Sequence, residues 1–479
     1  MNPGDNIVPL LNEEPFRQIR AAAEQLSLNA FLIGGFVRDK ILGRECKDID
    51  VVCDGSGIDL AEKTHKLLGL PGSPVVFKNF GTAQIVFGDL ILEFVGARKE
   101  SYRAESRKPE VSPGTLEEDQ LRRDFTINAL AFGLSGKSKG ILIDPFGGLA
   151  DLENRILRTP RDPDITYSDD PLRMLRAIRF SVQLDFEIEA ASLDAISRNS
   201  GRIQIISMER ITDELQKMLL ASRPSRAFIL MEKTGLLDKF FPEFVALKGV
   251  ETIEDKSHKD NFYHTLQVLD NLSLESDNIW LRWAALLHDI AKPRTKRFYP
   301  ETGWTFHGHE EKGARMVPGI FKKFKLPLDE RMRYVQKLVQ LHLRPIALTK
   351  EHITDSALRR LLFEAGNDLE DLMMLCKADI TSKNPVRVKK YLTRFSEVEE
   401  KLREVEEKDS IRNWQPPVSG EEIMEIFSIG PSREVGIIKN SIREAILEGH
   451  IKNEKSEALK LMVETAKKLG LEPKKGFGI

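Results

Sequence analysis

Short apolar runs alternate with turn residues in the first part of the chain, and a helical pattern follows. Five runs rich in β-branched and aromatic residues are separated by Gly, Asp and Pro between residues 30 and 97, which predicts strands. They are AFLIGG, DIDVVC, SPVVF, AQIVFG and LILEFVGA. Beyond residues 144–148, apolar residues recur three or four positions apart almost to the end, which predicts helices. The pattern therefore indicates an α+β protein.

The change of pattern divides the chain into four expected parts. They are an α/β head at residues 1–155, a helical neck at 156–235, a helical body at 236–400 and a helical tail at 401–479. At roughly 150 residues per domain, 479 residues provide for about three domains and a large buried core. Residues 103–114 mix charges with Pro and Gly, which predicts a mobile segment.

The charge balance excludes a uniformly basic nucleic-acid-binding protein. The chain has 72 Lys plus Arg and 74 Asp plus Glu, for a formal net charge of -2. Residues 291–350 nevertheless hold 14 Lys plus Arg and five Asp plus Glu, so we expect a phosphate-rich partner to contact this basic band. The apolar runs fall short of the roughly 20 residues of a membrane span, and the acidic start differs from a signal peptide. We therefore expect a cytoplasmic protein without a membrane partner.

Two glycines and two aspartates of the head form a candidate site for a nucleotide and a divalent cation. Gly34 and Gly35 follow an apolar run and precede a short helical segment, a turn where the backbone can approach a phosphate. Asp48 and Asp50 lie two positions apart in a predicted strand, so both project from one face and could hold Mg²⁺. Glu93, the lone acid of its strand, is the candidate third catalytic carboxylate. The alternatives are a plain turn and solvated acids at a strand edge.

The segment GGFVRDKILGRECKDIDVV resembles the signature of the bacterial-type tRNA nucleotidyltransferase and poly(A) polymerase family, a branch of the polymerase-beta-like superfamily. RRDFTINALAF, DPFGGLADLENRILRT, DDPLRMLRAIRF and ERITDEL follow in the family's order, and the tail is similar to the C-terminal part of CCA-adding enzymes. The resemblance implies a polymerase-beta-like head with a mixed sheet, an all-α neck, and a tail that binds RNA. It implies addition of CCA to tRNA 3′ ends from CTP and ATP, with release of pyrophosphate.

The resemblance also implies roles for residues around the glycine turn. Gly34, Gly35 and Arg38 would cradle the triphosphate, since a guanidinium binds phosphate oxygens in pairs. A second set would discriminate the ribose and hold the phosphates: Arg123, Asp124 and Asn128. Asp48 and Asp50 would be the magnesium ligands.

In the neck, the family uses an acid and an arginine as a template for the incoming base, here Asp170 and Arg173. An ionised Asp only accepts hydrogen bonds and an Arg only donates them, which suits adenine and cytosine but not guanine or uracil. Leaving a buried polar group unpaired costs about 1 to 3 kcal/mol, which provides the discrimination. This chain has Asp169 where the family usually has Glu, so the role of Asp169 stays open. Helix capping is the alternative role of Asp170.

Arginine dominates the bases of the neck. Residues 155–230 contain eleven Arg and a single Lys, and Arg173, Arg176 and Arg179 recur every third position along one predicted helix. Binding of nucleotide phosphates or bases would explain this preference. Salt bridges with the eleven acids of the same stretch are the alternative.

Histidines and aspartates of the body form a second candidate metal site, in an order that resembles the HD superfamily of metal-dependent phosphohydrolases. His264, His288, Asp289 and Asp379 would bind one divalent metal, and His309 with His342 would complete a second site. Mn, Fe, Ni, Zn and Mg all remain candidates. The resemblance implies hydrolysis of 2′,3′-cyclic or 2′-phosphates at RNA ends. The alternatives are an HD fold that only binds RNA and the use of His307 in place of His309.

Two other functions fit the same motifs. A poly(A) polymerase, or an enzyme that adds only CC or only A, would share the head and the neck. A protein of another class would be an HD phosphohydrolase whose inactive head binds RNA.

Overall fold

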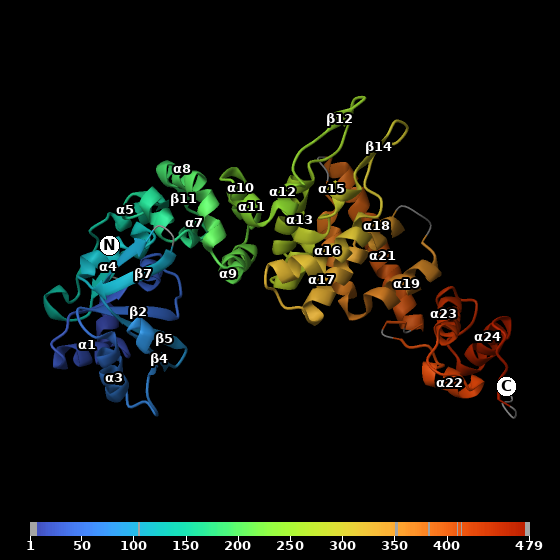
Figure 1. Cartoon of the computed structure of the whole chain (residues 1–479), viewed down its shortest axis with the longest axis horizontal. Helices are drawn as coiled ribbons and strands as arrows, with labels where there is room; N and C mark the ends of the chain where they lie inside the picture. Colours follow the sequence, from blue (N-terminus) through green and yellow to red (C-terminus); the bar gives the residue numbers. More distant parts are fainter. Residues whose placement is uncertain are drawn as a thin grey trace. The chain divides into compact units, whose positions relative to one another are not determined.

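The computed structural model describes residues 7–103, 106–349, 353–381, 384–409, 411–412 and 414–474, and these fall into two compact units (Figure 1). The amino-terminal unit extends from Met1 to Val245 and the carboxy-terminal unit from Ala246 to Ile479. A mixed sheet in the first unit and helices in both confirm the α+β class. Among the described residues, every helix is too short or too polar to cross a membrane.

Seven strands of the described residues form the mixed sheet of the head. Their order is β3 (Val75–Phe77), β4 (Thr82–Phe87), β5 (Leu90–Gly96), β2 (Asp48–Cys53), β1 (Ala30–Ile33), β8 (Ala131–Gly133) and β9 (Leu142–Ile143). β2 and β5 are parallel, and the other neighbours are antiparallel. The five predicted strands are confirmed. The apolar pattern does not predict β8 and β9, which have only three and two residues.

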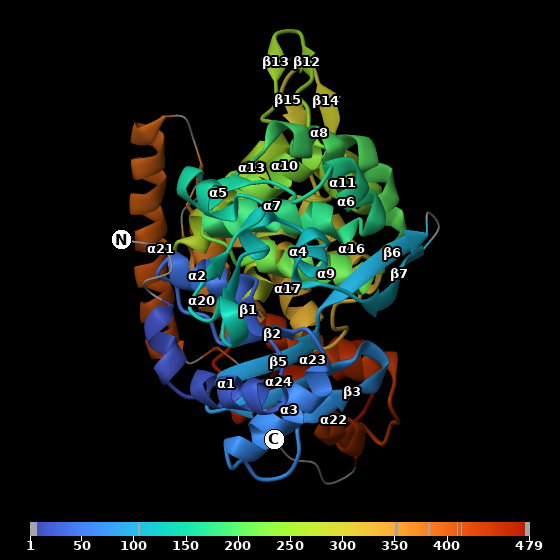
Figure 2. The ribbon, with the colours of Figure 1, turned by 90° about the vertical axis from the view of Figure 1, so that its left-hand side faces the viewer.

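Helices and short turns surround this sheet. They are η1 (Val8–Asn12), α1 (Phe16–Gln25), α2 (Gly35–Ile41), α3 (Gly57–Leu67), η2 (Lys78–Phe80), α4 (Leu116–Leu121), η3 (Thr126–Asn128), η4 (Gly136–Ser138) and α5 (Gly148–Asn154). In Figure 2, α1 and α3 lie together beside the sheet, and α3 contacts β4 and β5. The buried side chains of Phe31, Ile33, Val52 and Ala131 form a core cluster on the sheet. This packing holds β1 and β2, which carry the candidate residues, in fixed register.

A β-hairpin includes most of residues 103–114, the segment for which the sequence predicts mobility. β6 (Arg98–Arg103) pairs antiparallel with β7 (Ser106–Pro113), and residues 104–105 lie outside the described residues. Charged residues and prolines hide the alternation of these strands in the sequence. The backbone pairing nevertheless extends from Arg98 opposite Pro113 to Arg103 opposite Ser106.

The neck belongs to the same compact unit as the head. It contains α6 (Pro163–Asp169), α7 (Leu172–Leu184), α8 (Ala190–Asn199), η5 (Ser200–Ile205), α9 (Met208–Leu219), α10 (Ser225–Lys233), α11 (Leu236–Phe240), α12 (Pro242–Val245) and the short parallel pair β10 (Ile156–Leu157) and β11 (Glu187–Ile188). The unit continues past residue 235 because aromatic rings pack there. The ring of Phe244 lies 5.4 Å from that of Phe228 and 5.5 Å from that of Phe241.

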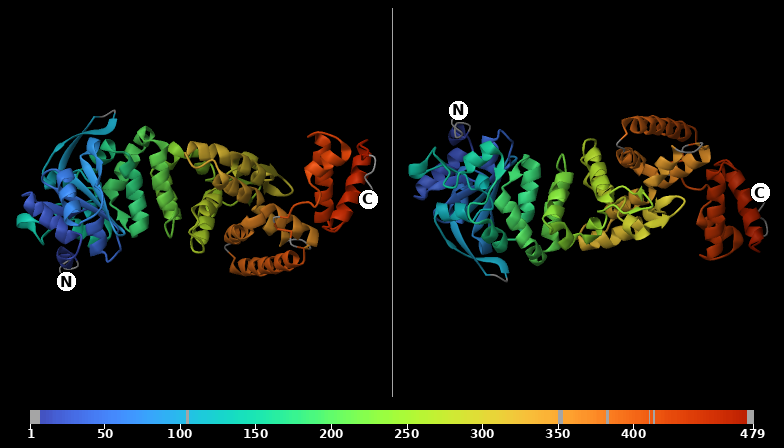
Figure 3. Two further views of the ribbon diagram at one scale, coloured as in Figure 1. Left: turned by 90° about the horizontal axis from the view of Figure 1, so that it is seen from below. Right: turned by 90° about the horizontal axis from the view of Figure 1, so that it is seen from above.

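The carboxy-terminal unit is mainly helical. Its helices are α13 (Asn261–Ser273), α14 (Ile279–Leu287), α15 (Lys292–Thr295), α16 (His309–Lys323), α17 (Glu330–Leu341), α18 (Leu343–Leu348), α19 (Asp355–Ala365), η6 (Gly366–Asp368), α20 (Leu369–Asp379), α21 (Pro385–Asp409), α22 (Gly420–Phe427), α23 (Arg433–Leu447) and α24 (Lys455–Lys468). Both views of Figure 3 show α22 to α24 as one group at the carboxyl end. Two hairpins, β12 (Thr252–Ile253) with β13 (Lys256–Ser257) and β14 (Arg297–Tyr299) with β15 (Gly303–Thr305), project side by side in Figure 2.

A buried ion pair ties the head to the neck. Asp124, which is 7% exposed, accepts hydrogen bonds from Nε of Arg176 on α7 at 2.7 Å and from Nδ2 of Asn128 at 3.0 Å. Burial opposes ionisation of this carboxyl, but the Arg176 guanidinium and the Asn128 amide lower the pKa of Asp124 to about 2. The carboxylate therefore stays charged at any ordinary pH and fixes α7 on the head.

This ion pair makes the stability of the amino-terminal unit depend on pH. Because the pKa of Asp124 in the folded state is lower than in the unfolded state, the pair stabilises the fold above about pH 4, and this stabilisation is lost as the pH falls towards 2. At about 1.4 kcal/mol per pKa unit, Asp124→Asn should lower the free energy of unfolding by about 2 kcal/mol at pH 6 and by less at pH 3. Urea denaturation followed by far-UV circular dichroism measures the difference.

Unfolding of the carboxy-terminal unit provides an internal reference for this measurement. The four Trp residues, at positions 280, 283, 304 and 414, all belong to the carboxy-terminal unit, so their fluorescence follows its unfolding separately. Asp164→Asn is the matched control, since Asp164 pairs with Arg198 on the surface of the same unit and should contribute little. A difference between wild type and Asp124→Asn that is the same at pH 6 and pH 3 would contradict the prediction.

Candidate nucleotide site and candidate metal centre

Asp48, Asp50 and Glu93 lie on one face of the sheet. Parallel β2 and β5 pair so that Asp50 is directly opposite Glu93, and residues opposite each other project from the same face. Asp48, two positions before Asp50, projects from that face as well. The fold thus brings together the three carboxylates that the sequence indicates.

The environment of these carboxylates suits a cation. Burial raises the pKa of Asp50 more than the nearby Arg123 guanidinium lowers it, and the charges of Asp119 and Asp48 raise it further. Burial and the charge of Asp50 also raise the pKa of Glu93. A site in which several carboxylates disfavour each other's ionisation fits a divalent cation, which would remove the repulsion.

Gly34 creates space beside Asp50. Its φ angle of +80° lies in the left-handed region that glycine tolerates. A Cβ atom at this position would lie 2.9 Å from Nη1 of Arg123 and 3.1 Å from Oδ2 of Asp50. Any side chain here would therefore collide with the guanidinium and the carboxylate, so Gly34 lets the backbone approach both.

Arg38 is held beside the glycine turn by two partners. Its guanidinium donates to both carboxylate oxygens of Asp39, at 2.9 and 2.8 Å, and its Nη1 donates to Oδ1 of Asn128 at 2.7 Å. Its Nη2 would lie 3.6 Å from a Cβ at Gly35. The predicted residues Gly35, Arg38 and Asn128 are therefore close together, while their contact with a triphosphate stays a prediction.

Asp119 organises the two arginines of the RRDFTINA motif. Its fully buried Oδ1 accepts from Nη2 of Arg122 at 2.6 Å, and its Oδ2 accepts from Nη2 of Arg123 at 3.3 Å. Sequence reasoning missed Asp119. The available signal was an acid three and four positions before the arginines, a spacing that allows pairing on a helix.

Asp170 and Arg173 lie at the start of α7. Oδ1 of Asp170 accepts from the backbone nitrogen of Leu172 at 3.2 Å, so the predicted capping contact is present. Arg173 donates from Nη2 to the backbone carbonyl of Arg122 at 2.7 Å. Its Nη1 is buried, and among the described residues it has no hydrogen-bond partner. An acceptor and an unsatisfied donor therefore lie three residues apart, next to the arginines that Asp119 holds.

The other two arginines of α7, Arg176 and Arg179, form ion pairs. Arg176 pairs with Asp124, and Arg179, only 8% exposed, donates to Glu214 at 2.5 Å. Its Nη1 donates to Oε1 of Gln183 at 2.7 Å, so two of its three nitrogens are engaged within the neck. Asp169 pairs with Arg161, which gives a structural role to the acid that replaces the family's Glu.

In the carboxy-terminal unit, six side chains form two adjoining groups of possible metal ligands. We name them the first metal group, with His264, His288 and Asp379, and the second metal group, with Asp289, His309 and His342. Within each group the ligand atoms lie within 4.8 Å of one another. They come from α13, from the end of α14, from the start of α16, from the end of α17 and from the end of α20.

Asp289 lies between the two groups. Its Oδ2 is 3.3 Å from Nε2 of His288, and its Oδ1 is 3.2 Å from Nε2 of His309 and 3.9 Å from Nε2 of His342. The sequence assigns Asp289 to the His264 set alone, whereas the structure places it next to both sets. His307 is exposed, so His309 is the histidine that reaches the cluster.

The buried donor atoms fit a metal. Nδ1 of His288 lies 2.7 Å from the carbonyl of Ala285, and its buried Nε2 has no hydrogen-bond partner among the described residues, because the approach to Asp289 lacks hydrogen-bond geometry. Nε2 is therefore the ring nitrogen that faces the carboxylates, while Nδ1 is held by a backbone carbonyl, as in metal-binding histidines.

The charges of the cluster keep its carboxylates ionised and His342 neutral, whereas His288 differs: burial lowers the pKa of His288, but the Asp289 carboxylate raises it above its ordinary value. Burial opposes ionisation of Asp289, but the neighbouring His288 and Lys292 lower its pKa well below the ordinary range. Lys292 Nζ lies 2.5 Å from Asp289 Oδ2. Burial and the nearby His288 lower the pKa of His342 to about 3, so this imidazole is neutral at physiological pH and can bind a metal.

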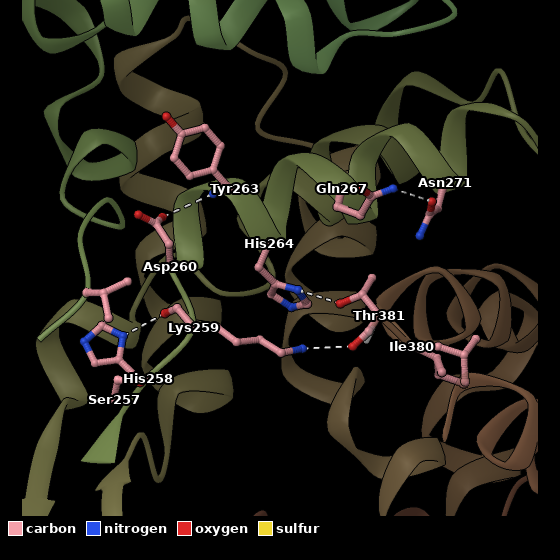
Figure 4. A pocket seen from close by; sticks show the side chains of 12 residues that line it. Ser257, His258, Lys259, Asp260, Tyr263, His264, Gln267, Asn271, Ile380 and Thr381 are labelled. Atoms are coloured by element: carbon pink, nitrogen blue, oxygen red, sulfur yellow. Dashed lines mark hydrogen bonds between the residues drawn. The ribbon is translucent and has the colours of Figure 1, made fainter. Parts of the chain in front are cut away.

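A cavity of about 1010 Å³ adjoins the first metal group. His264 lies in its wall, together with Lys259, Tyr263, Asn271 and Thr381 (Figure 4). The other wall residues belong to the base of the β12–β13 hairpin, to the start and middle of α13, to the end of α20 and to α21. This cavity is large enough to admit a nucleotide-sized ligand to the first metal group.

Family models match the chain along most of its length. The Poly A polymerase head domain matches residues 30–158, and the probable RNA and SrmB-binding site of polymerase A matches residues 185–247. The HD domain matches residues 261–383, which contain both metal groups.

The A-adding tRNA nucleotidyltransferase of Deinococcus radiodurans is 31% identical over 436 residues, which cover 88% of this chain and 92% of the relative. The CC-adding tRNA nucleotidyltransferase of Thermus thermophilus is 30% identical over 448 residues, with 88% and 91% covered. The solved Thermotoga maritima CCA-adding enzyme complexed with tRNA_CCA has the same fold, with a TM-score of 0.59, 21% identity, and 96% and 98% covered. The chain belongs to the family of tRNA nucleotidyltransferases.

Proposed function

We propose that the chain adds CCA to the 3′ ends of tRNA, using CTP and ATP and releasing pyrophosphate. The observation that carries the proposal is the buried, unsatisfied Nη1 of Arg173, three residues from the Asp170 carboxylate. Cytosine and adenine each offer an amine donor beside a ring-nitrogen acceptor, so one Asp and Arg pair can read both. Relatives with A-adding and CC-adding names support a site that handles these two bases.

Contacts in the amino-terminal unit link Arg173, the proposed base-reading residue, with Asp50, the proposed magnesium ligand. Arg173 donates to the backbone of Arg122, and the neighbouring Arg123 lies beside Asp50 and Gly34. Arg123 would therefore place its charge on the phosphates while Arg173 pairs with the base. Magnesium held by Asp48, Asp50 and Glu93 would activate the attacking 3′-hydroxyl and neutralise charge on the triphosphate.

For the body, we propose hydrolysis of phosphates at RNA ends. The two metal groups would hold divalent ions among Mn, Fe, Ni, Zn and Mg, which polarise water for attack on a phosphate ester. The basic band at residues 291–350 supports contact with RNA near these groups. Lys312, Arg315 and Lys322 of this band are exposed along α16, whose first residue is His309.

The product ends test the proposal directly. With a tRNA that lacks its 3′ CCA, we expect ordered addition of C, C and A followed by arrest when CTP and ATP are both present, and CC alone when only CTP is present. Sequencing of the 3′ ends measures this. A tail of A residues would indicate a poly(A) polymerase, and products limited to CC or to A would indicate an enzyme of restricted output.

Two variants of the head control this experiment. Asp48→Asn removes one charge of the carboxylate trio and should reduce addition by about 10³-fold or more, since metal electrostatics dominate this chemistry. Asp89→Asn, at an exposed acid paired with Lys47 beside the same sheet, should leave addition unchanged. Addition by Asp48→Asn at the wild-type rate would show that the catalytic site is elsewhere.

Replacement of the base-reading arginine should alter nucleotide choice. Arg173→Lys keeps the positive charge but loses the planar guanidinium that can donate two parallel hydrogen bonds. The preference for CTP and ATP over UTP and GTP should therefore fall by about 10- to 100-fold, the cost of one lost buried hydrogen bond to the base. Rates of incorporation of the four nucleotides measure this preference. Arg198→Lys, at the exposed pair with Asp164, is the matched control. Unchanged selectivity in Arg173→Lys would exclude Arg173 as a reader.

The two proposed activities should separate by mutation. Asp289→Asn removes the carboxylate that lies between the metal groups, so hydrolysis of RNA with a 2′,3′-cyclic phosphate end should fall by about 10²-fold or more, with nucleotide addition unchanged. Asp48→Asn should reduce nucleotide addition and leave hydrolysis unchanged. Assays with each candidate metal measure hydrolysis, and tryptophan fluorescence checks that the carboxy-terminal unit is folded. A wild-type protein without hydrolysis in any metal would favour a body that only binds RNA.

A further inference from the structure

Three of the four histidines in the metal groups are oriented by a backbone carbonyl of their own chain segment. In each, Nδ1 lies within hydrogen-bond distance of the backbone carbonyl three residues earlier. The pairs are His288 with Ala285 at 2.7 Å, His309 with Phe306 at 2.8 Å and His342 with Val339 at 2.7 Å. Because a carbonyl can only accept, it requires the proton on Nδ1 and leaves the Nε2 lone pair for a metal.

His264 is oriented differently. Its Nδ1 lies 2.9 Å from Oγ1 of Thr381, and its Nε2 lies 2.9 Å from Oδ1 of Asp379 (Figure 4). Thr381 is far from His264 in sequence, so this ring is held by a side chain of another element. A metal held between Nε2 and Asp379 requires the His264 proton on Nδ1, and the Thr381 hydroxyl can accept it there, as the carbonyls do for the other histidines.

Two backbone contacts hold Thr381 where its hydroxyl can reach His264. The ammonium of Lys259 donates to the carbonyl of Thr381 at 2.9 Å, and the backbone nitrogen of Thr381 donates to the carbonyl of Asp379 at 2.7 Å. Figure 4 shows Lys259 extending along the cavity towards Thr381, on the side where His264 lies. The segment before α13 and the end of α20 are thus joined at this residue.

We propose that Thr381 is a positioning residue of the first metal group, whose hydroxyl orients His264 for metal binding. This inference rests on the proposed binding of metal by the body. The second metal group contains no ligand held by Thr381, since the rings of His309 and His342 are fixed by carbonyls. Loss of the hydroxyl therefore weakens one metal site and leaves the other unchanged.

The substitution Thr381→Val tests this role, because valine keeps the shape and removes the hydroxyl. Thr381→Ser keeps the hydroxyl and serves as the conservative variant. The matched control is Thr265→Val on the adjacent position of α13, because the buried Oγ1 of Thr265 has no hydrogen-bond partner among the described residues. All variants are made in the full chain, and tryptophan fluorescence during urea denaturation verifies folding of the carboxy-terminal unit.

Calorimetric titration with Mn²⁺ and electron paramagnetic resonance of bound Mn²⁺ are the readouts, and neither depends on hydrolysis. We expect wild type, Thr381→Ser and Thr265→Val to bind two ions with similar affinities. In Thr381→Val, one of the two sites should lose about 10- to 100-fold in affinity, as is usual when a metal ligand loses its orienting partner.

The outcomes separate this inference from the proposal on which it rests. A wild type that binds no Mn²⁺ would contradict metal binding by the body and the role of Thr381 with it. A wild type that binds two ions, with Thr381→Val binding both equally well, would contradict the role of Thr381 alone. Equal weakening in Thr381→Ser and Thr381→Val would also overturn it, because the serine variant retains the hydroxyl.

Discussion

The arrangement of the candidate nucleotide site depends on one fully buried carboxylate, that of Asp119. An uncompensated charge inside the protein would cost several kcal/mol, and the guanidinium groups of Arg122 and Arg123 compensate it. These contacts, together with that of Arg122 to Glu100, hold the arginines in place. Arg123 is next to Asp50, and the carbonyl of Arg122 receives Arg173, so the carboxylate face and α7 are joined through Asp119.

Asp289 is the corresponding buried carboxylate of the carboxy-terminal unit, but different groups compensate its charge. Its two oxygens lie near different metal groups, and its charge is compensated by the neighbouring His288 and Lys292. The four histidines come from separate helices. Helix packing therefore sets the spacing of the metal groups. The hydrogen bond made by Nδ1 sets the orientation of each imidazole ring.

The sequence identifies candidate residues for metal and nucleotide binding more readily than the residues that keep those side chains in position. The period of two in β2 identifies Asp48 and Asp50, and a lone acid identifies Glu93, because strand geometry relates sequence spacing to direction. Asp119 and Thr381 are not identified in this way, because their importance lies in contacts made only after folding. For the same reason, the arginine spacing in α7 does not separate Arg173, with its unsatisfied Nη1, from Arg179, which is paired with Glu214.

The two carboxylate sites differ in how far the protein compensates their charge. In the head, the pKa values of Asp50 and Glu93 are raised, so one guanidinium does not offset burial and mutual repulsion. In the body, burial opposes ionisation of both acids, but His288 and Lys292 lower the pKa of Asp289, and His264 and His288 lower that of Asp379. Protonation as the pH falls is therefore opposed more strongly at Asp289 and Asp379 than at Asp50 and Glu93.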